Sequence, residues 1–351
     1  MSLVRKLAAV SMAALLALTA AACGDDSDTS TSDGAGTTSG SSSDAQYPIT
    51  IEHALGTTVI EKKPERVATV QWANHEVPLA LGVVPVGMAA ANFGDPDGDG
   101  LLPWVADKLE ELGAETPVLF DETDGIDFEA VADTNPDVIL AAYSGLTQED
   151  YETLSEIAPT IPYPEAPWAT SWRDMIRFNS KAMGMEAEGL QLIEDIEAAM
   201  KAEVAKYPEL EGKTIMFAGH IDPTDLSEIG FYTTADTRVK FFEDLGLTHA
   251  DIVVEMSADS DKFSGTISAE QVDLFDDVDI IVSYGDEEGE LLKTLQADPL
   301  ASKIPALQRG SVVFFAGSTP LATAANPTPL AIEYVLADYV EMLAEAARKV
   351  G

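Results

Sequence analysis

The chain has very little cysteine and few basic residues for its length. Cys23 is the only cysteine among 351 residues, so no disulfide framework can form and stability has to come from an apolar core. Lys and Arg number 20 against 61 Asp and Glu, which gives a formal net charge of −41 at pH 7. Such a chain repels nucleic acid and anionic lipid headgroups, so nucleic-acid binding and general anion binding are excluded. We interpret the acidity as an aid to solubility, with adaptation to salt as the alternative.

The chain also lacks the common sequence motifs of hydrolytic and metal-dependent enzymes. It contains no G-x-S-x-G elbow and no H-E-x-x-H motif. The four histidines, His53, His75, His220 and His249, do not have the spacing of metal ligands. We therefore expect a binding protein without catalytic residues, resident metal or cofactor.

What the chain does have is an apolar N-terminal run that ends in the cysteine. Arg5 and Lys6 precede the apolar stretch 7–22, a pattern typical of a secretory signal peptide. The apolar stretch is shorter than a typical membrane-spanning helix. Residues 24–46 are rich in Ser, Thr, Gly and Asp, which predicts a flexible linker. The cysteine resembles that of the lipobox of bacterial lipoproteins, whose thiol takes a diacylglycerol, although Ala20 replaces the usual leucine. The alternative is a small buried thiol.

Strand-like and helix-like segments alternate along the remaining 300 or so residues. This alternation predicts mostly parallel sheets with helices on their faces. The stretch 171–206 has no proline and carries apolar residues at helical spacing, which predicts a long helix that Gly184 and Gly189 can bend. We therefore predict an α/β fold of two lobes joined by a single long helix, with a ligand cleft between the lobes. The predicted segments are 1–22 signal peptide, 23–46 lipidated linker, 47–168 first lobe, 169–206 linking helix and 207–351 second lobe.

Aromatic and polar residues follow several of the predicted strands, where parallel sheets bind ligands. Aromatic rings with a few polar tips suit a ligand that is partly apolar and rich in oxygen. For each aromatic residue the alternative is core packing, which we favour for Trp104 and Trp172, and Arg66 is expected to be structural. The candidate ligand-binding residues are Trp72, Asn74, His75, Tyr143, Trp168, Arg173, His220, Tyr232, Arg238 and Tyr284.

Several blocks resemble one protein family in their order and spacing. The chain is similar to the iron–siderophore substrate-binding lipoproteins of bacterial ABC importers, in the helical-backbone class of periplasmic binding proteins that also includes vitamin B12 and haem binders. The blocks are PERVATVQW (64–72), ALGVVPVG (80–87), LPW (102–104), DFEAVADTNPDVIL (127–140), YETLSEIAPTIPY (151–163), SWRDM (171–175), FFEDLGL (241–247), ISAEQVDLFDDVDIIV (267–282) and RGSVVFF (309–315).

The resemblance implies two Rossmann-like lobes and a function without catalysis. It implies that a lipid-anchored monomer on the outer face of the cell membrane captures a ferric siderophore and passes it to a permease dimer with its ATPase. In this family a carboxylate on each lobe docks on the permease, and Glu129 and Glu270 match those positions. The alternative is that each acid is stabilised by the N-terminal end of its predicted helix and has no partner. Haem is the alternative ligand, with His75, His220 or Tyr143 as axial ligands, and a siderophore-processing extracellular hydrolase is the other alternative.

The scarcity of basic residues also favours one type of chelate. Only Arg173 and Arg238, with Arg177 as a further candidate, are predicted near the cleft, whereas a tris-catecholate iron complex carries three negative charges. We therefore expect a hydroxamate or mixed-ligand chelate of low charge. The segment DPDGDG (95–100) matches the start of a calcium loop, but Ala106 stands where a bidentate glutamate is required, so we expect a solvated turn.

Overall fold

The computed structural model describes residues 45–258, 262–286 and 289–351. The predicted signal peptide, Cys23 and most of the predicted linker lie outside these residues. None of the helices in the described ranges combines the length and the apolar character needed to cross a bilayer.

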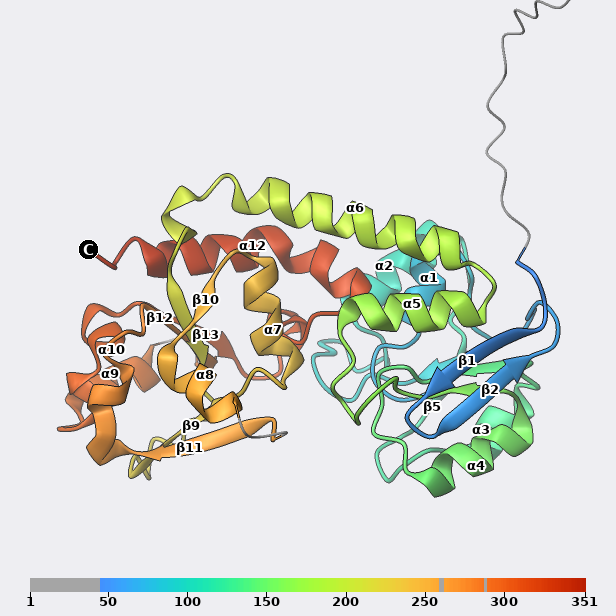
Figure 1. The fold of residues 1–351 in the computed structure, drawn as a ribbon, viewed down its shortest axis with the longest axis horizontal. Coiled ribbons are helices and arrows are strands. Elements are labelled where there is room, and N and C mark those ends of the chain that lie inside the picture. Colours follow the sequence, from blue (N-terminus) through green and yellow to red (C-terminus); the bar gives the residue numbers. More distant parts are fainter. Residues whose placement is uncertain (1–44, 259–261, 287–288) are drawn as a thin grey trace, which may run out of the picture. The chain divides into compact units, whose positions relative to one another are not determined.

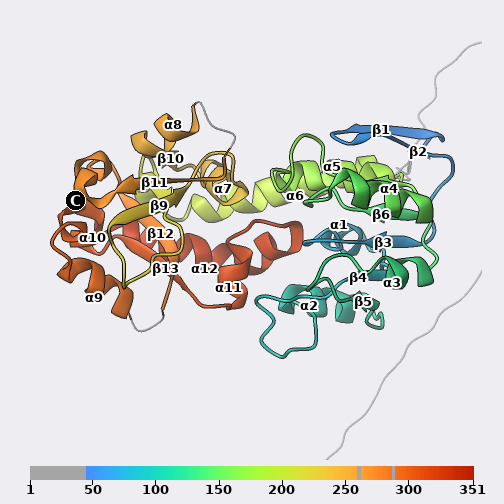
Figure 2. The same ribbon diagram turned by 90° about the horizontal axis from the view of Figure 1, so that it is seen from below.

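The first lobe is built on a five-stranded parallel sheet with the strand order β5-β4-β3-β6-β7 (Figure 2). Its central strands are short and buried on both faces, as expected for a parallel sheet covered by helices. The strands are β3 (Val67–Thr69), β4 (Gly87–Ala89), β5 (Val118–Phe120), β6 (Val138–Leu140) and β7 (Thr160–Ile161). The helices between them are α1 (Glu76–Ala80), α2 (Pro103–Glu111), α3 (Phe128–Asp133) and α4 (Gln148–Ile157). An antiparallel hairpin of β1 (Ile49–His53) and β2 (Gly56–Ile60) precedes the sheet.

The second lobe is built on a four-stranded parallel sheet with the order β10-β8-β12-β13. An antiparallel ribbon of β9 (Glu228–Tyr232) and β11 (Ser264–Ser268) lies beside it. The sheet strands are β8 (Thr214–Phe217), β10 (Thr248–His249), β12 (Ile280–Gly285) and β13 (Val312–Ala316). The helices are α7 (Thr237–Asp244), α8 (Asp251–Ser257), α9 (Glu290–Ala297), α10 (Pro305–Arg309), α11 (Pro320–Ala324), α12 (Pro329–Ala347) and the short 3₁₀ helices η1 (Pro208–Leu210), η2 (Ala269–Phe275) and η3 (Ala301–Lys303).

Two parallel sheets with alternating helices confirm the predicted α/β class and its two lobes. One detail of that prediction needs correction, because the single linking helix is two helices, α5 (Trp172–Ala182) and α6 (Glu186–Val204). Gly184 lies between them with a left-handed φ of +69°, and a Cβ there would lie 2.1 Å from the Tyr47 hydroxyl oxygen. The break therefore needs a glycine, both for its backbone angle and for the close approach of Tyr47.

Two long helices join the lobes. Helix α6 packs against α12, and Figure 1 shows the two side by side. The carboxylate of Glu76 on α1 accepts hydrogen bonds from the backbone N–H groups of Leu330 and Ala331 at the start of α12. The first lobe thus caps the last helix of the chain, whose other end packs on the second sheet.

Candidate ligand-binding site

The carboxyl ends of the central strands carry the loops that form the candidate site. Strand β3 leads into the loop 70–75, β4 into the loop that begins at Ala90, and β6 into Tyr143 and Ser144. In the second lobe, β8 leads to His220 and β12 carries Tyr284 near its end. Strand ends of this kind are the usual ligand edge of parallel sheets.

On the first lobe, three of the predicted residues line one cavity. Trp72, His75 and Trp168 lie around a space of about 240 Å³, together with Gln71 and Glu122. Trp168 is 38% exposed, and its ring stands edge-on to Tyr143 with the ring centroids 5.4 Å apart. Aromatic faces therefore dominate this wall, as suits a partly apolar ligand.

The loop after β3 is held in a strained backbone conformation. Gln71 and Ala73 both have a left-handed φ, near +60°. The Glu122 carboxylate accepts the backbone N–H of Gln71 at 3.0–3.1 Å and its side-chain amide at 3.0 Å. Burial raises the pKa of Glu122, although these bonds lower it. Strain supported in this way is typical of functional loops, and the sequence prediction missed both Gln71 and Glu122.

His75 lies in the same cavity as a neutral side chain. It is 7% exposed, and burial lowers its pKa to about 4. Its Nδ1 atom is buried without a hydrogen-bond partner among the described residues. An imidazole in this state adds no positive charge to the site at neutral pH.

On the second lobe, four of the predicted residues form one cluster, in which Arg238 contacts Tyr232 and Tyr284, and His220 contacts Tyr284. The guanidinium makes two bonds to Asp236, Nε to Oδ1 at 2.8 Å and Nη2 to Oδ2 at 2.6 Å. It also donates to the Tyr284 hydroxyl at 3.1 Å and lies 3.7 Å from the ring centroid of Tyr232. His220 stacks on Tyr284 with centroids 4.5 Å apart. Burial disfavours the charge of Arg238, but Asp236 outweighs this and raises its pKa.

The two walls meet across the lobes. The Tyr143 hydroxyl accepts a hydrogen bond from the amide of Asn326 at 3.0 Å, and the Asn326 carbonyl accepts one from the Thr237 hydroxyl at 2.7 Å. A further cavity of about 370 Å³ is lined by Phe93 from the first lobe and by His220 and Tyr284 from the second. These contacts define a cleft with one wall on each lobe, as the sequence predicted.

Two of the ten predicted ligand residues make contacts within the protein, and for Asn74 these contacts correct the prediction. Asn74 is fully buried, and its side chain bonds both backbone groups of Tyr143, so it ties two loops together instead of facing a ligand. Arg173 on α5 bonds Glu197 on α6 at 2.6 Å and Asp244 on α7 at 2.8 Å. It therefore braces three helices, and its charge is already paired.

The structural roles expected for three other residues are confirmed. Trp104 and Trp172 are 4% and 2% exposed, and their indole N–H groups donate to Glu76 and Asp244. Arg66 bonds the backbone carbonyls of Thr134 and Asn135.

The DPDGDG segment forms a turn in which the Asp95 carboxylate accepts three backbone N–H groups, from residues 97, 98 and 100. Within the described ranges, no group of three His, Cys, Asp or Glu side chains is arranged to hold a metal ion.

A family model described as "Periplasmic binding protein" matches residues 67–318. The chain belongs to this family. The match begins at β3 and ends just after β13, so it includes both parallel sheets and the loops of the two walls that lie before Ser318.

The curated relatives of this chain are named as binding proteins for iron chelates. The probable siderophore-binding lipoprotein YfiY of Bacillus subtilis is 26% identical over 238 residues, which cover 67% of each chain. The Fe(3+)-citrate-binding protein YfmC of the same organism is 24% identical over 259 residues, 73% of this chain and 75% of the relative.

Solved structures of siderophore-binding proteins are also similar to this chain. PiaA of Streptococcus pneumoniae, crystallised with ferrichrome, is 45% identical with a TM-score of 0.81, and the match covers 86% of this chain and all of PiaA. Staphylococcus aureus SirA, crystallised with staphyloferrin B, shares the fold at 20% identity and a TM-score of 0.61, over 85% of this chain and 98% of SirA. The resemblance to siderophore-binding proteins of ABC importers is thus confirmed.

The two expected docking carboxylates of this periplasmic binding protein are exposed. Glu129 lies in the first turn of α3, after the capping residue Asp127, and Glu270 lies in the first turn of η2, after Ser268. The segment 269–275 is a 3₁₀ helix, in which Gln271 departs from helical backbone angles. Each lobe therefore presents one such carboxylate at a helix start, and their role in docking stays a prediction.

Proposed function

We propose that this periplasmic binding protein captures a ferric siderophore of the hydroxamate type in the cleft and delivers it to an ABC permease. In this proposal the protein is held at the outer face of the membrane through Cys23 and releases the chelate unchanged. The observation that carries the proposal is the charge balance of the cleft.

Arg238 is the one arginine or lysine among the described side chains that we place on the cleft walls, and its charge is matched by Asp236 at 2.6–2.8 Å. Glu122 adds a carboxylate on the opposite wall. His75 stays neutral. A chelate with three negative charges would meet no excess of positive charge here, whereas an uncharged ferric trihydroxamate meets aromatic rings and hydrogen-bond donors.

The rings on the two walls give such a ligand its contact area. Trp72 and Trp168 on the first lobe face a cavity, and Tyr232 and Tyr284 surround Arg238 on the second. Three of the five guanidinium N–H groups of Arg238 donate to Asp236 and Tyr284, and the other two can donate hydrogen bonds to a hydroxamate oxygen. The solved relative with 45% identity was crystallised with ferrichrome, a trihydroxamate, which supports the same class of ligand.

A competition experiment tests the proposal. The purified protein is incubated with equal amounts of ferrichrome and ferric enterobactin, and native mass spectrometry identifies the bound mass. We expect a one-to-one complex with intact ferrichrome. Preferential binding of enterobactin contradicts the assignment of ligand class, and accumulation of cleaved chelate contradicts a function without catalysis.

A further inference from the structure

The second lobe contains a partly open cavity that the cleft does not account for. Its volume is about 220 Å³, roughly seven groups of the size of a water molecule. One side of it is apolar, formed by Phe275, Ile281, Leu295, Ile304 and Leu307. We call this cavity the chamber. It lies between the sheet, helices α9 and α10, and the loop that joins β8 to β9.

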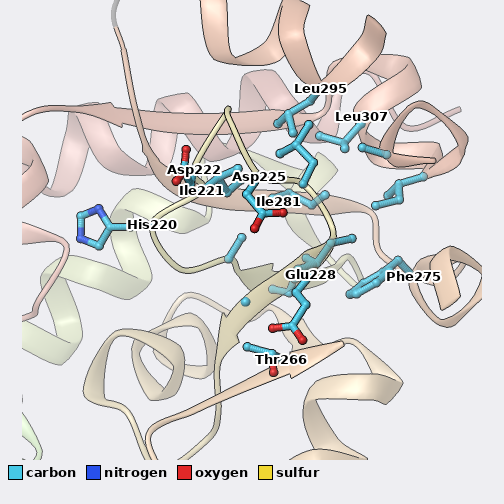
Figure 3. A pocket seen from close by; sticks show the side chains of 17 residues that line it. His220, Ile221, Asp222, Asp225, Glu228, Thr266, Phe275, Ile281, Leu295 and Leu307 are labelled. Carbon is cyan, nitrogen blue, oxygen red and sulfur yellow. The ribbon is translucent and has the colours of Figure 1, made fainter. Parts of the chain in front are cut away.

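The other side of the chamber carries only negative charge. Asp222, Asp225 and Glu228 line it, and Figure 3 shows their carboxylates on the side opposite Leu295, Leu307 and Phe275. Hydrogen bonds from Thr224 and from Ser227 lower the pKa of Asp222 and Asp225, so both are ionised at neutral pH. None of the described residues lining the chamber is lysine or arginine. An apolar space with this rim favours a cation attached to a hydrocarbon chain.

The chamber shares a wall with the cleft. His220 and Ile221 line both the chamber and the cleft cavity that contains Tyr284 and Phe93. His220 stacks on Tyr284, which in turn accepts the hydrogen bond from Arg238. When a ligand is held against Tyr284, the segment 220–221 is therefore what separates a flexible substituent of that ligand from the chamber.

We infer that the chamber is a second binding site, for an aliphatic chain that ends in an ammonium group. The chain buries its methylene groups against Leu295 and Leu307, and the ammonium group pairs with Asp225 and Glu228 at the rim. Two sources have this chemistry: a pendant alkylammonium arm of the chelate in the cleft, or a free alkylammonium ion. The first source rests on the proposed function, whereas the second does not.

The chamber itself is tested with n-pentylammonium as the probe and n-pentanoate as a probe of equal length and opposite charge. Binding to the full folded protein is followed by ligand-observed NMR. We expect pentylammonium to bind at least tenfold more tightly than pentanoate. The double variant Asp225→Asn/Glu228→Gln should abolish this preference, and the control Glu341→Gln/Glu345→Gln, which removes two exposed acids of α12, should keep it. Equal binding of the two probes, or an unchanged preference in the rim variant, overturns the inference.

A second variant checks the chamber without touching its charge. Thr266 is exposed on β11 and lines the chamber, so Thr266→Trp should block it and leave the core intact. We expect loss of pentylammonium binding with an unchanged unfolding midpoint. Full retention of binding in a folded Thr266→Trp protein argues against occupation of the chamber.

The source of the chain is tested with two forms of one chelate. Ferrioxamine B is a ferric trihydroxamate with a free pentylammonium arm, and its N-acetyl derivative has the same iron centre without the cation. We expect at least a fivefold preference for the amine, lost in the rim variant. Equal binding of the two forms overturns the arm as the source and leaves the proposed function standing. Failure of both forms and of ferrichrome to bind contradicts the proposed function, while pentylammonium binding would still support the chamber.

Discussion

Glu76 and Trp104 form a buried pair in which the indole N–H donates to the carboxylate at 2.7 Å. The other carboxylate oxygen of Glu76 accepts the N–H of Leu330 at 2.8 Å, at the start of α12. Glu76 is fully buried, and burial raises its pKa to about 6 although these hydrogen bonds lower it. One carboxylate therefore links α1, α2 and α12, and its charge makes this junction sensitive to pH.

This junction predicts how stability changes with pH. A carboxyl group with a higher pKa in the folded state binds its proton more tightly there, so its contribution to stability is full below the unfolded pKa of about 4.5 and is lost as pH rises through 6. Between pH 4 and pH 7, the wild type should lose about 2 kcal/mol relative to Glu76→Gln. Urea unfolding of both proteins at several pH values measures this. A free-energy difference that is constant with pH contradicts the prediction.

The Arg238–Asp236 pair predicts a change in ligand preference. Asp236→Asn keeps an oxygen to cap α7 but leaves the Arg238 guanidinium without its paired carboxylate. We expect the affinity for ferric enterobactin relative to ferrichrome to rise about tenfold, which corresponds to about 1.4 kcal/mol. Isothermal titration with both chelates measures the ratio.

The Arg173–Asp244 pair provides the matched control, since it is an arginine–aspartate pair outside the cleft. Asp244→Asn should leave the ratio of the two affinities unchanged. Equal effects of the two substitutions would mean that the overall charge of the protein, and not the cleft, sets the preference.

Trp168 is positioned by the glycine beneath it. A Cβ on Gly145 would lie 2.3 Å from Nε1 of Trp168, so Gly145→Ala has to displace the indole. Because Trp168 is 38% exposed, we expect a small change in stability but about a tenfold loss of ferrichrome affinity. Gly230→Ala is the control, since its Cβ would lie 3.9 Å from the nearest side-chain atom, on Thr266. Wild-type affinity in Gly145→Ala would show that Trp168 does not contact the ligand.

The exposed carboxylates Glu129 and Glu270 are expected to act only in delivery. Glu129→Lys/Glu270→Lys should retain ferrichrome binding but abolish iron uptake by cells that carry the protein and its permease, because the charge that each docking carboxylate is expected to present to the permease is reversed. The control Glu149→Lys/Glu186→Lys reverses two other exposed first-turn acids, on α4 and α6. Normal uptake in the first double variant refutes the docking role.

Local signals in the sequence predicted much of the fold. Helix α4, for example, begins at a capping box formed by Thr147 and Asp150, a signal that lies within four residues of the sequence. The β1–β2 hairpin and the β9–β11 ribbon were not predicted, and β11 follows β9 only after α7, β10 and α8, so no local signal connects those two strands. The break at Gly184 depends on the hydroxyl of Tyr47, which is remote in sequence.

The candidate site was predicted in part for a similar reason. Strand ends located the loops that form the two walls. The sequence does not indicate which way a loop side chain points, so it did not show that Asn74 is buried between two loops. Arg173 lies on α5, and its pairing with Asp244, 71 residues away, is not visible in the sequence. Glu122 was missed because its partner, Gln71, is 51 residues away.

The central claim is that a cleft without excess positive charge selects an uncharged ferric hydroxamate. Trp72 and Trp168 line the cleft, so quenching of tryptophan fluorescence reports binding directly. A titration with ferrichrome and with ferric enterobactin under the same conditions is the most direct measurement. The account predicts saturable quenching by ferrichrome at a concentration at least tenfold lower than by enterobactin. Tighter binding of enterobactin would contradict it.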